Sequence, residues 1–310
     1  MTDEKAGTIF LTGATGFLGR HVLRELLARG YRVRCLVRGP SLGRLPDDPR
    51  AERVVGNVLL PRAYTRSVAG CQAAIHLVGI IAETPEATFR QIHVEGTQNL
   101  IVACQKGGVR RFVHVSALGA APSPGAAYFQ SKHQAETLVR SNGLDFTIFR
   151  PSLVHGPDGE LMRMLVRMVK SALPLAVVGA GRQRLQPVYV EDMARLLADA
   201  LERPQTVGQT YEAGGAQIVT FRALLDAIAH AVRGRPRWKL RVPVFAAMLA
   251  AACLEFVLRR PPFTREQLRM LLAGSVCETL EPLERDFGFR PRGFDETFPL
   301  YAADFRPRER

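Results

Sequence analysis

A tyrosine and a lysine, Tyr128 and Lys132, stand four residues apart in a segment whose pattern is helical from 128 to 141. Side chains at positions i and i+4 are neighbours on one helix face. A phenol has an ordinary pKa of about 10, too high for a base near neutrality, but an adjacent cation favours the phenolate. The pair could therefore move a proton at a carbonyl oxygen, with Tyr128 as general acid/base and Lys132 lowering its pKa. The alternative is an exposed amphipathic helix, because this spacing often arises by chance.

A glycine-rich stretch between an apolar run (8–11) and a helical pattern (21–28) is the second candidate for chemistry. Gly13 allows a tight turn, Gly16 lets backbone approach a pyrophosphate, and Gly19 lets a helix pack closely on a sheet. The first N–H groups of the helix would then face the phosphates. The spacing predicts a dinucleotide site rather than a glycine-rich turn without a ligand. Its expected residues are Thr12, Gly13, Thr15, Gly16, Phe17, Leu18 and Gly19.

The residue after the second predicted strand (31–37) indicates which dinucleotide binds. An NAD-specific fold places Asp or Glu there for the ribose hydroxyls, and this chain has Arg38. Arg38, helped by Arg34 or Arg44, could pair with the 2′-phosphate of NADP. We therefore expect NADP(H) to be favoured over NAD(H). The alternative is a solvated arginine in an arginine-rich chain.

Short apolar runs alternate with helical patterns over the first two thirds of the chain. This alternation requires right-handed crossovers and a parallel sheet covered by helices on both faces. The predicted fold class is α/β, a doubly wound parallel sheet of the Rossmann type. We expect the dinucleotide-binding domain at 1–157, with 185–213 returning to it. A smaller, interleaved substrate or partner region is expected at 158–184 and 214–310.

Several phrases of the sequence resemble motifs of the extended and atypical short-chain dehydrogenase/reductase superfamily: TGATGFLG (12–19), RFVHVSALG (111–119), YFQSK (128–132), FRPSLVHG (149–156) and PVYVED (187–192). The resemblance covers residues 8 to about 215 and is best for the branch that includes the alpha-subcomplex 9 accessory subunit of respiratory complex I and its bacterial epimerase-like relatives. It implies that Lys132 also holds the nicotinamide ribose. It further implies that Asn57, Val78 and Pro151 lie beside the cofactor.

The chain departs from the catalytic pattern of that superfamily at three places. Active members carry Ser or Thr where this chain has Ala117, with Ser116 one residue early as the remaining candidate for the substrate oxygen. His93 replaces the Asn of an N-V-x-G-T motif, and Asn57 stands where Gly-Asp is usual. Two functions therefore stay open. One is an oxidoreductase or epimerase-like enzyme that uses Tyr128. The other is a weakly active or inactive NADPH-binding structural or assembly protein that docks on a membrane or partner.

Composition limits the remaining function classes. The 310 residues are 47% hydrophobic and 23% charged, which is ordinary for a globular protein. The five cysteines are widely spread, as expected for reduced thiols of a cytoplasmic protein, and we expect no metal site. The polar start of the chain predicts no secretory signal. The net charge of +13 comes from dispersed basic residues without a nucleic-acid motif, so nucleic-acid binding is not expected.

The stretch 242–258 is apolar apart from Glu255 and is flanked by basic residues. It is shorter than the about 20 apolar residues that cross a bilayer. A packed core helix is the first interpretation. A helix at an anionic membrane surface, or one that docks on a partner, is the alternative. The expected substrate is a small molecule. An interfacial helix would favour a lipid-like one, whereas arginines near 163–184 could suit an anionic one.

Overall fold

A computed structural model describes residues 7–122, 125–171, 173–259 and 261–305, and these divide into two compact units. Unit 1 comprises residues 1–151, 190–213 and 279–289, and unit 2 comprises 152–189, 214–278 and 290–310. The chain therefore crosses between the units several times. The first unit ends at Pro151, six residues before the boundary expected from the sequence.

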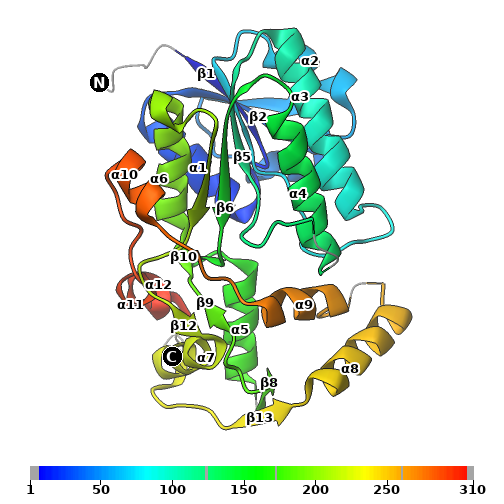
Figure 1. Cartoon of the computed structure of the whole chain (residues 1–310), viewed down its shortest axis with the longest axis vertical. Helices are drawn as coiled ribbons and strands as arrows, with labels where there is room; N and C mark the ends of the chain where they lie inside the picture. The colour runs from blue at the N-terminus through cyan, green and yellow to red at the C-terminus, as the bar shows by residue number, and fades with distance from the viewer. Residues whose placement is uncertain (1–6, 123–124, 172, 260, 306–310) are drawn as a thin grey trace. The chain divides into compact units, whose positions relative to one another are not determined.

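A seven-stranded parallel sheet forms the centre of unit 1 (Figure 1). Its strand order, β3-β2-β1-β4-β5-β6-β11, reverses direction between β1 and β4. In open sheets of this kind, ligands bind outside the carboxyl ends of the strands at such a reversal. The predicted doubly wound fold is confirmed. The strands are β1 (Thr8–Thr12), β2 (Arg32–Val37), β3 (Ala51–Val55), β4 (Ala73–His76), β5 (Arg111–Val115), β6 (Asp145–Pro151) and β11 (Gln209–Ala213).

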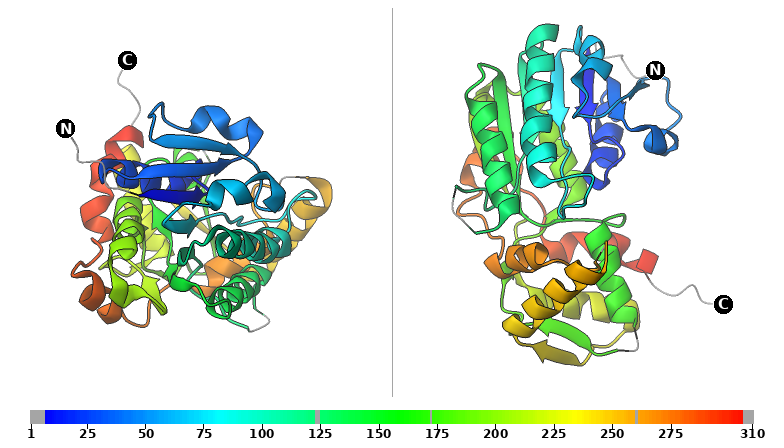
Figure 2. Two further views of the ribbon diagram at one scale, coloured as in Figure 1. Left: turned by 90° about the horizontal axis from the view of Figure 1, so that it is seen from above. Right: turned by 90° about the vertical axis from the view of Figure 1, so that its right-hand side faces the viewer.

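Helices cover both faces of this sheet (Figures 1 and 2). The α1 and α6 helices pack together on one face, and α2, α3 and α4 lie on the other. Among the latter helices the core is apolar and fully buried, with Phe10, Leu100 and Phe112 each 0% exposed. The α-helices of unit 1 are α1 (Phe17–Ala28), α2 (Thr65–Val68), α3 (Gly96–Gly107), α4 (Ala127–Arg140), α6 (Val190–Asp199) and α10 (Glu281–Phe287). Short turns of helix are η1 (Gly39–Arg44), η2 (Pro61–Ala63), η3 (Arg90–Glu95), η4 (Ala200–Glu202) and η5 (Pro204–Thr206).

The chain returns to unit 1 through α6 and β11. Of the segment 185–213, which the sequence predicted to return to this domain, only β11 joins the main sheet. Residues 184–189 instead contribute β9 (Arg184–Leu185), paired with β12 (Val219–Thr220), and β10 (Val188–Tyr189), paired with β7 (Val154–His155). Residues 185–189 therefore belong to unit 2, because the main sheet ends at β11, which pairs with β6.

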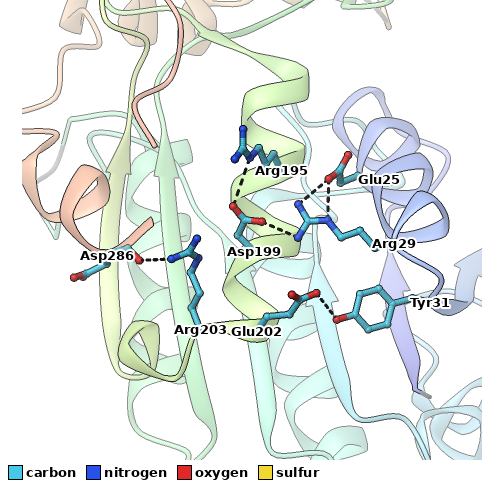
Figure 3. A network of polar contacts seen from close by, with 8 residues as sticks. All are labelled: Glu25, Arg29, Tyr31, Arg195, Asp199, Glu202, Arg203 and Asp286. Carbon is cyan, nitrogen blue, oxygen red and sulfur yellow. Dashed lines mark hydrogen bonds and ion pairs between the residues drawn. The ribbon is translucent and has the colours of Figure 1, made fainter. Parts of the chain in front are cut away.

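Ion pairs and hydrogen bonds fasten the returning segment to the first helix (Figure 3). Arg29 at the end of α1 pairs with Glu25 and with Asp199 of α6, each at 2.7 Å. Tyr31 donates a hydrogen bond to Glu202 at 2.8 Å. Two segments about 170 residues apart in sequence are thus joined by partly buried charged groups, which the sequence pattern did not indicate.

Unit 2 combines short strands with helices. Thr220 caps α7 by accepting a hydrogen bond from the Ala223 N–H at 3.1 Å. Near the end of the chain, Phe294 and Tyr301 are buried around His155, so this segment contributes a core rather than only wrapping the surface. The remaining elements are α5 (Glu160–Lys170), β8 (Leu175–Val178), α7 (Phe221–Arg233), β13 (Lys239–Val242), α8 (Val244–Val257), α9 (Arg265–Ala273), α11 (Phe294–Thr297), α12 (Pro299–Ala302) and η6 (Ala303–Phe305).

Candidate active site and dinucleotide site

The glycine-rich turn connects β1 to α1 in a geometry that only glycine allows at two positions. Gly13 has φ +80°, and a Cβ there would lie 3.1–3.2 Å from the backbone of residues 77 and 78. A Cβ on Gly19 would lie 2.0 Å from the Gly13 carbonyl oxygen. The helix therefore approaches the turn more closely than any side chain permits. The backbone N of Val78 lies against the turn at this contact, and its place beside the cofactor stays a prediction.

The amino end of α1 has free backbone donors and no competing carboxylate. The Gly16 N–H, before the helix, donates to the Gly13 oxygen at 2.9 Å, and the next amide with a bond to the turn is that of Arg20, which donates to the Gly16 oxygen at 3.1 Å. The N–H groups of Phe17, Leu18 and Gly19 precede it, and no acidic side chain stands in the first turn. Gly16 is exposed. Such a helix end suits the pyrophosphate of a dinucleotide, because its N–H groups and dipole favour negative charge.

The expected cofactor residues follow the carboxyl ends of successive strands. Arg38 follows β2, Asn57 follows β3, and Pro151 ends β6. Arg38 is exposed, and its guanidinium makes no ion pair with the residues that the structure describes. Asn57 uses its side-chain oxygen locally, since Oδ1 accepts from the Leu59 N–H at 3.1 Å, which leaves its NH₂ group as donor.

Two expected contributors have side chains that serve the protein interior instead. Arg34 pairs with Glu52 at 2.9 Å and donates to the backbone oxygens of Ser67 and Ala69, so it does not assist Arg38. The Thr12 hydroxyl is fully buried, and a hydrogen bond of 2.7 Å joins it to His76 Nδ1. Any contact of Thr12 with a cofactor would have to come from its backbone.

Tyr128 and Lys132 lie one turn apart on α4, as predicted. The Lys132 ammonium is buried, and its Nζ donates to the Val115 carbonyl oxygen at 3.0 Å. It also lies close to Gly79, where a Cβ would be 3.4 Å from Nζ. The Tyr128 ring is partly exposed and meets the rings of Phe89 and His93 edge-on. The helix thus places a phenol and an ammonium beside the segment that follows β4.

The expected lowering of the Tyr128 pKa by Lys132 is not found. Burial raises the pKa of Tyr128 to about 12. Burial also lowers the pKa of Lys132 to about 8, although the charge of Glu136 opposes that shift. Desolvation therefore dominates at both groups. Tyr128 is a protonated phenol near neutrality, which makes it a proton donor.

His93 occupies the position of the missing Asn and makes two side-chain hydrogen bonds. Its Nε2 accepts from the Ile80 N–H at 3.0 Å, and its Nδ1 lies 2.8 Å from the Ser131 hydroxyl. The Ser131 hydroxyl donates to the Tyr128 carbonyl oxygen, so His93 must carry its proton on Nδ1. Burial, followed by the charge of Lys132, lowers the pKa of His93 to about 2. His93 is therefore a neutral residue that ties α4 to the segment after β4.

A second buried histidine extends this network to the glycine turn. His76 Nδ1 bonds the Thr12 hydroxyl, and Nε2 lies 3.1 Å from the Thr97 hydroxyl. Thr97 in turn donates to the His93 carbonyl oxygen at 2.5 Å. Since that hydroxyl is used as a donor, it accepts from His76 Nε2–H. The chain of bonds runs from β1 through β4 to the π-helical turn η3, and sequence analysis missed it. The signal was present, because Thr12 and His76 are register partners at the ends of adjacent strands.

The residues after β5 do not supply the usual substrate-holding hydroxyl. Ala117 is buried. Ser116 is also buried, and its hydroxyl lies beside the Glu136 carboxylate without a hydrogen bond of good geometry, although it helps to lower the pKa of Glu136. Glu136 is 0% exposed and receives two hydrogen bonds from Arg150, at 2.8 and 2.7 Å. Ser116 thus adjoins a structural ion pair, and its catalytic role stays a prediction.

A doubly wound parallel sheet, a glycine-rich turn at its reversal and a Tyr–Lys pair on α4 define a dinucleotide-binding protein of the short-chain dehydrogenase/reductase type. The chain belongs to the NAD dependent epimerase/dehydratase family, whose profile matches residues 9–214. The predicted membership of this superfamily is confirmed, and so is an NAD-type dinucleotide as the cofactor class of the family.

Individual relatives have diverse functions. The chain is 31% identical to the mitochondrial NADH dehydrogenase [ubiquinone] 1 alpha subcomplex subunit 9 of Arabidopsis thaliana, over 83% of this chain but only 65% of that protein. It is 29% identical to a ceramide reductase of Caulobacter vibrioides, over 82% of this chain and 80% of the other. The solved dTDP-glucose 4,6-dehydratase DesIV of Streptomyces venezuelae, with NAD bound, superposes with a TM-score of 0.76 at 23% identity, covering 96% of each chain. That structure supports the fold alone.

Proposed function

We propose that this protein is an NADP(H)-dependent oxidoreductase or epimerase-like enzyme in which Tyr128 is the general acid/base. The observation that carries the proposal is the placement of Tyr128 and Lys132 on one face of α4, with the ammonium buried at Gly79. A buried lysine that makes no ion pair within 4.0 Å among the described residues is costly for stability alone. Its presence is easier to explain by a role in binding or catalysis.

Binding of the dinucleotide would use groups that are already in place. The N–H groups at the start of α1 would hold the pyrophosphate, and Arg38 would pair with a 2′-phosphate. The Lys132 ammonium has three N–H donors, of which one goes to Val115, so others remain for a ribose hydroxyl. When bound, a nicotinamide cofactor donates or accepts a hydride.

The protonation state of Tyr128 favours proton donation to the oxygen of a carbonyl. With a pKa raised to about 12, the phenol keeps its proton at neutral pH and can give it up only when a stronger base forms beside it. The alkoxide that develops as a carbonyl is reduced is such a base. The reverse reaction, alcohol oxidation, would require a deprotonated Tyr128 and would therefore be favoured at high pH.

We propose a small carbonyl substrate with a lipid-like body rather than an anionic one. The similarity to a ceramide reductase supports this choice, as does the exposed apolar surface of unit 2 described below. We place the enzyme in the cytoplasm, which agrees with free thiols at all five cysteines, three of them buried.

A second candidate is an NADPH-binding protein without turnover, acting in structure or assembly. It is favoured by Ala117, which has no hydroxyl, and by Ser116, whose hydroxyl adjoins the buried Glu136–Arg150 pair. The similarity to the complex I subunit also supports it. In this case the dinucleotide would stabilise unit 1 and take no part in chemistry.

One experiment separates the two candidates. NADPH and NADH affinities are measured on the purified protein, and aliphatic ketones, long-chain carbonyls and sugar nucleotides are screened for turnover. If the enzyme proposal holds, Tyr128→Phe should lower kcat by at least about 100-fold with the NADPH affinity unchanged. Lys132→Met should lower both kcat and the NADPH affinity. Lys106→Met, at an exposed lysine, is the matched control and should change neither. Binding of NADPH without any Tyr128-dependent turnover would favour the second candidate.

A further inference from the structure

Helix α8 in unit 2 is apolar on all sides, yet little of it is buried. Its residues from Val244 to Val257 include one charged side chain, Glu255. Only Ala247 and Ala251 are buried, whereas Phe245 is 76% and Phe256 is 92% exposed. A helix that is hydrophobic all round is normally covered. The interpretation of 242–258 as a packed core helix is therefore wrong.

Three of the large exposed side chains of α8 form one stripe. Phe245, Leu249 and Phe256 are separated by four and seven residues, so the helical period puts them on the same face. Ala247 and Ala251 lie on the opposite face and pack with Leu268 of α9, the adjacent helix (Figures 1 and 2). Unit 2 thus holds the helix by its small side chains and leaves the large ones outside. We call Phe245, Leu249 and Phe256 the α8 stripe.

Further exposed apolar residues lie just before β13, the strand that leads into α8, and before its partner strand β8. Trp238 is 70% exposed immediately before β13, and its carbonyl oxygen accepts from the Leu175 N–H. Leu173, two residues before β8, which pairs with β13, is 73% exposed. Single exposed apolar side chains are ordinary, but a series of large ones along one element and its approach marks an interaction surface.

Basic residues flank α8 in the sequence. Residues 233–269 contain nine Lys or Arg and two carboxylates, Glu255 and Glu266. Both carboxylates are already paired, Glu255 with Arg265 at 2.6 Å and Glu266 with Arg269 at 3.3 Å. Exposed arginines stand before and after the helix, at Arg241 and Arg259. The surface therefore combines exposed phenylalanines with an excess of cations, which suits an anionic partner.

We propose that α8 docks on an anionic lipid surface, with the α8 stripe among the headgroups and upper acyl chains and the flanking arginines at lipid phosphates. Fourteen residues of helix span about 21 Å, which is short of the about 30 Å hydrocarbon core. No helix in the described parts of the chain has the length and apolarity needed to cross a bilayer. Two copies packed stripe to stripe would bring two cationic surfaces together, so charge favours lipid over self-association.

The single tryptophan of the chain, Trp238, is 70% exposed six residues before α8 and reports without a label on lipid contact of the segment that leads into the helix. The full-length protein is mixed with vesicles of phosphatidylcholine, alone or with phosphatidylglycerol, at low and high salt. We expect it to sediment with the anionic vesicles at low salt, with a blue shift of Trp238 emission and quenching by brominated lipid. High salt should weaken binding, because it screens attraction to the lipid charge. The test needs no cofactor, so it stands or falls separately from the proposed enzyme activity.

Matched variants identify the stripe as the contact. Phe245→Gln/Phe256→Gln should weaken vesicle binding more than about tenfold, since the double variant removes the largest apolar side chains that lipid would bury. Leu60→Gln/Leu300→Gln removes two exposed apolar side chains, 61% and 62% exposed, that are not part of α8, and should bind as wild type. Thermal unfolding checks that both fold. Equal binding to uncharged vesicles, no binding at low salt, or a dimer in sedimentation velocity that the α8 variant dissociates would each overturn the proposal.

Discussion

The His93 imidazole accepts a hydrogen bond from the backbone N–H of Ile80 across 3.0 Å. The bond joins the π-helical turn η3 to the segment after β4, next to the glycine whose Cβ would touch both His93 and Lys132. π-Helical turns are rare and occur frequently at functional sites. His93 therefore does not merely mark the loss of an Asn. It connects the segment beside the cofactor turn with the helix that carries Tyr128.

We expect His93→Ala to reduce the free energy of unfolding by about 2–4 kcal/mol, because it leaves a cavity and removes the hydrogen bonds of His93 to the Ile80 N–H and the Ser131 hydroxyl. His93→Asn should recover part of this loss and should restore NADPH affinity more than stability, since an amide oxygen can accept from Ile80. Urea unfolding and dinucleotide titration measure the two effects. His230→Ala, at an exposed histidine of α7, is the control. If His93→Ala unfolds at the same urea concentration as this control, the positioning role is wrong.

Acid should destabilise unit 1 before its carboxylates titrate. His76, His93 and His114 are at most 2% exposed. Burial lowers the pKa of His76 to about 3 and of His93 to about 2, and that of His114 well below its usual value. The unfolded chain, with histidine pKa values of about 6.5, binds protons that the folded state does not.

The stability of unit 1 is therefore complete above about pH 6.5 and falls as the pH drops below it, by about 1.4 kcal/mol per histidine and pH unit. For three histidines we expect a loss of about 4 kcal/mol between pH 7.5 and 5.5. Urea titrations at the two pH values, followed by circular dichroism, measure it. The exposed His230→Gln should leave the difference unchanged. Equal stability at both pH values would contradict the buried neutral state.

The parts of the fold that were predictable from sequence are those with a local signal. The turn at Gly13 and the strands before and after it follow from glycine spacing and apolar runs, and so does the Tyr128/Lys132 helix. The way the chain returns from unit 2 to unit 1 was not predictable from such local signals. The short strand at 188–189 pairs with β7 rather than the main sheet, and α10 contributes Phe287 to a cluster with Phe149 and Tyr211. Such pairings depend on contacts over long sequence separations, which periodicity does not encode.

In the candidate site, too, local sequence signals predicted some features, whereas others depend on the folded structure. Residue types and spacing gave Tyr128 and Lys132, but not the direction of the tyrosine pKa, because burial is a property of the folded chain. His93 was interpreted as a departure from a motif, and only the geometry shows its hydrogen bonds. For α8, apolar composition favoured a core helix, yet the tertiary structure buries only Ala247 and Ala251.

Glu136 is expected to be the most costly carboxylate to remove from unit 1. It is 0% exposed and bonds both Arg150 and Arg140. Burial alone would raise its pKa, but the hydrogen bonds from Arg150 and the other partners outweigh burial and lower it. Its stabilising effect is therefore present above the unfolded carboxyl pKa of about 4.3 and is lost as the pH falls through the lower folded value.

We expect Glu136→Gln to cost about 3–5 kcal/mol in urea unfolding at pH 7, since it leaves two arginines facing a neutral group. The surface pair of Glu95 with Arg90, 3.4 Å apart and half exposed, provides the comparison. Glu95→Gln should cost less than about 1 kcal/mol. Similar losses for the two variants would mean that Glu136 is solvated in solution.

Arg38 determines the preference between the two dinucleotides if our cofactor proposal is correct. It is exposed after β2, whereas Arg34 is occupied by Glu52 and by backbone oxygens. A charge-assisted bond to a 2′-phosphate is worth about 1.5–3 kcal/mol, so Arg38→Ala should weaken NADPH binding about 10- to 100-fold. NADH has no 2′-phosphate, and its affinity should change less than about twofold. Calorimetric titration of both nucleotides measures this, with the exposed Arg24→Ala of α1 as control. An equal loss for NADPH and NADH would assign Arg38 to the adenosine or to folding, and tighter binding of NADH by the wild type would refute the NADP(H) preference outright.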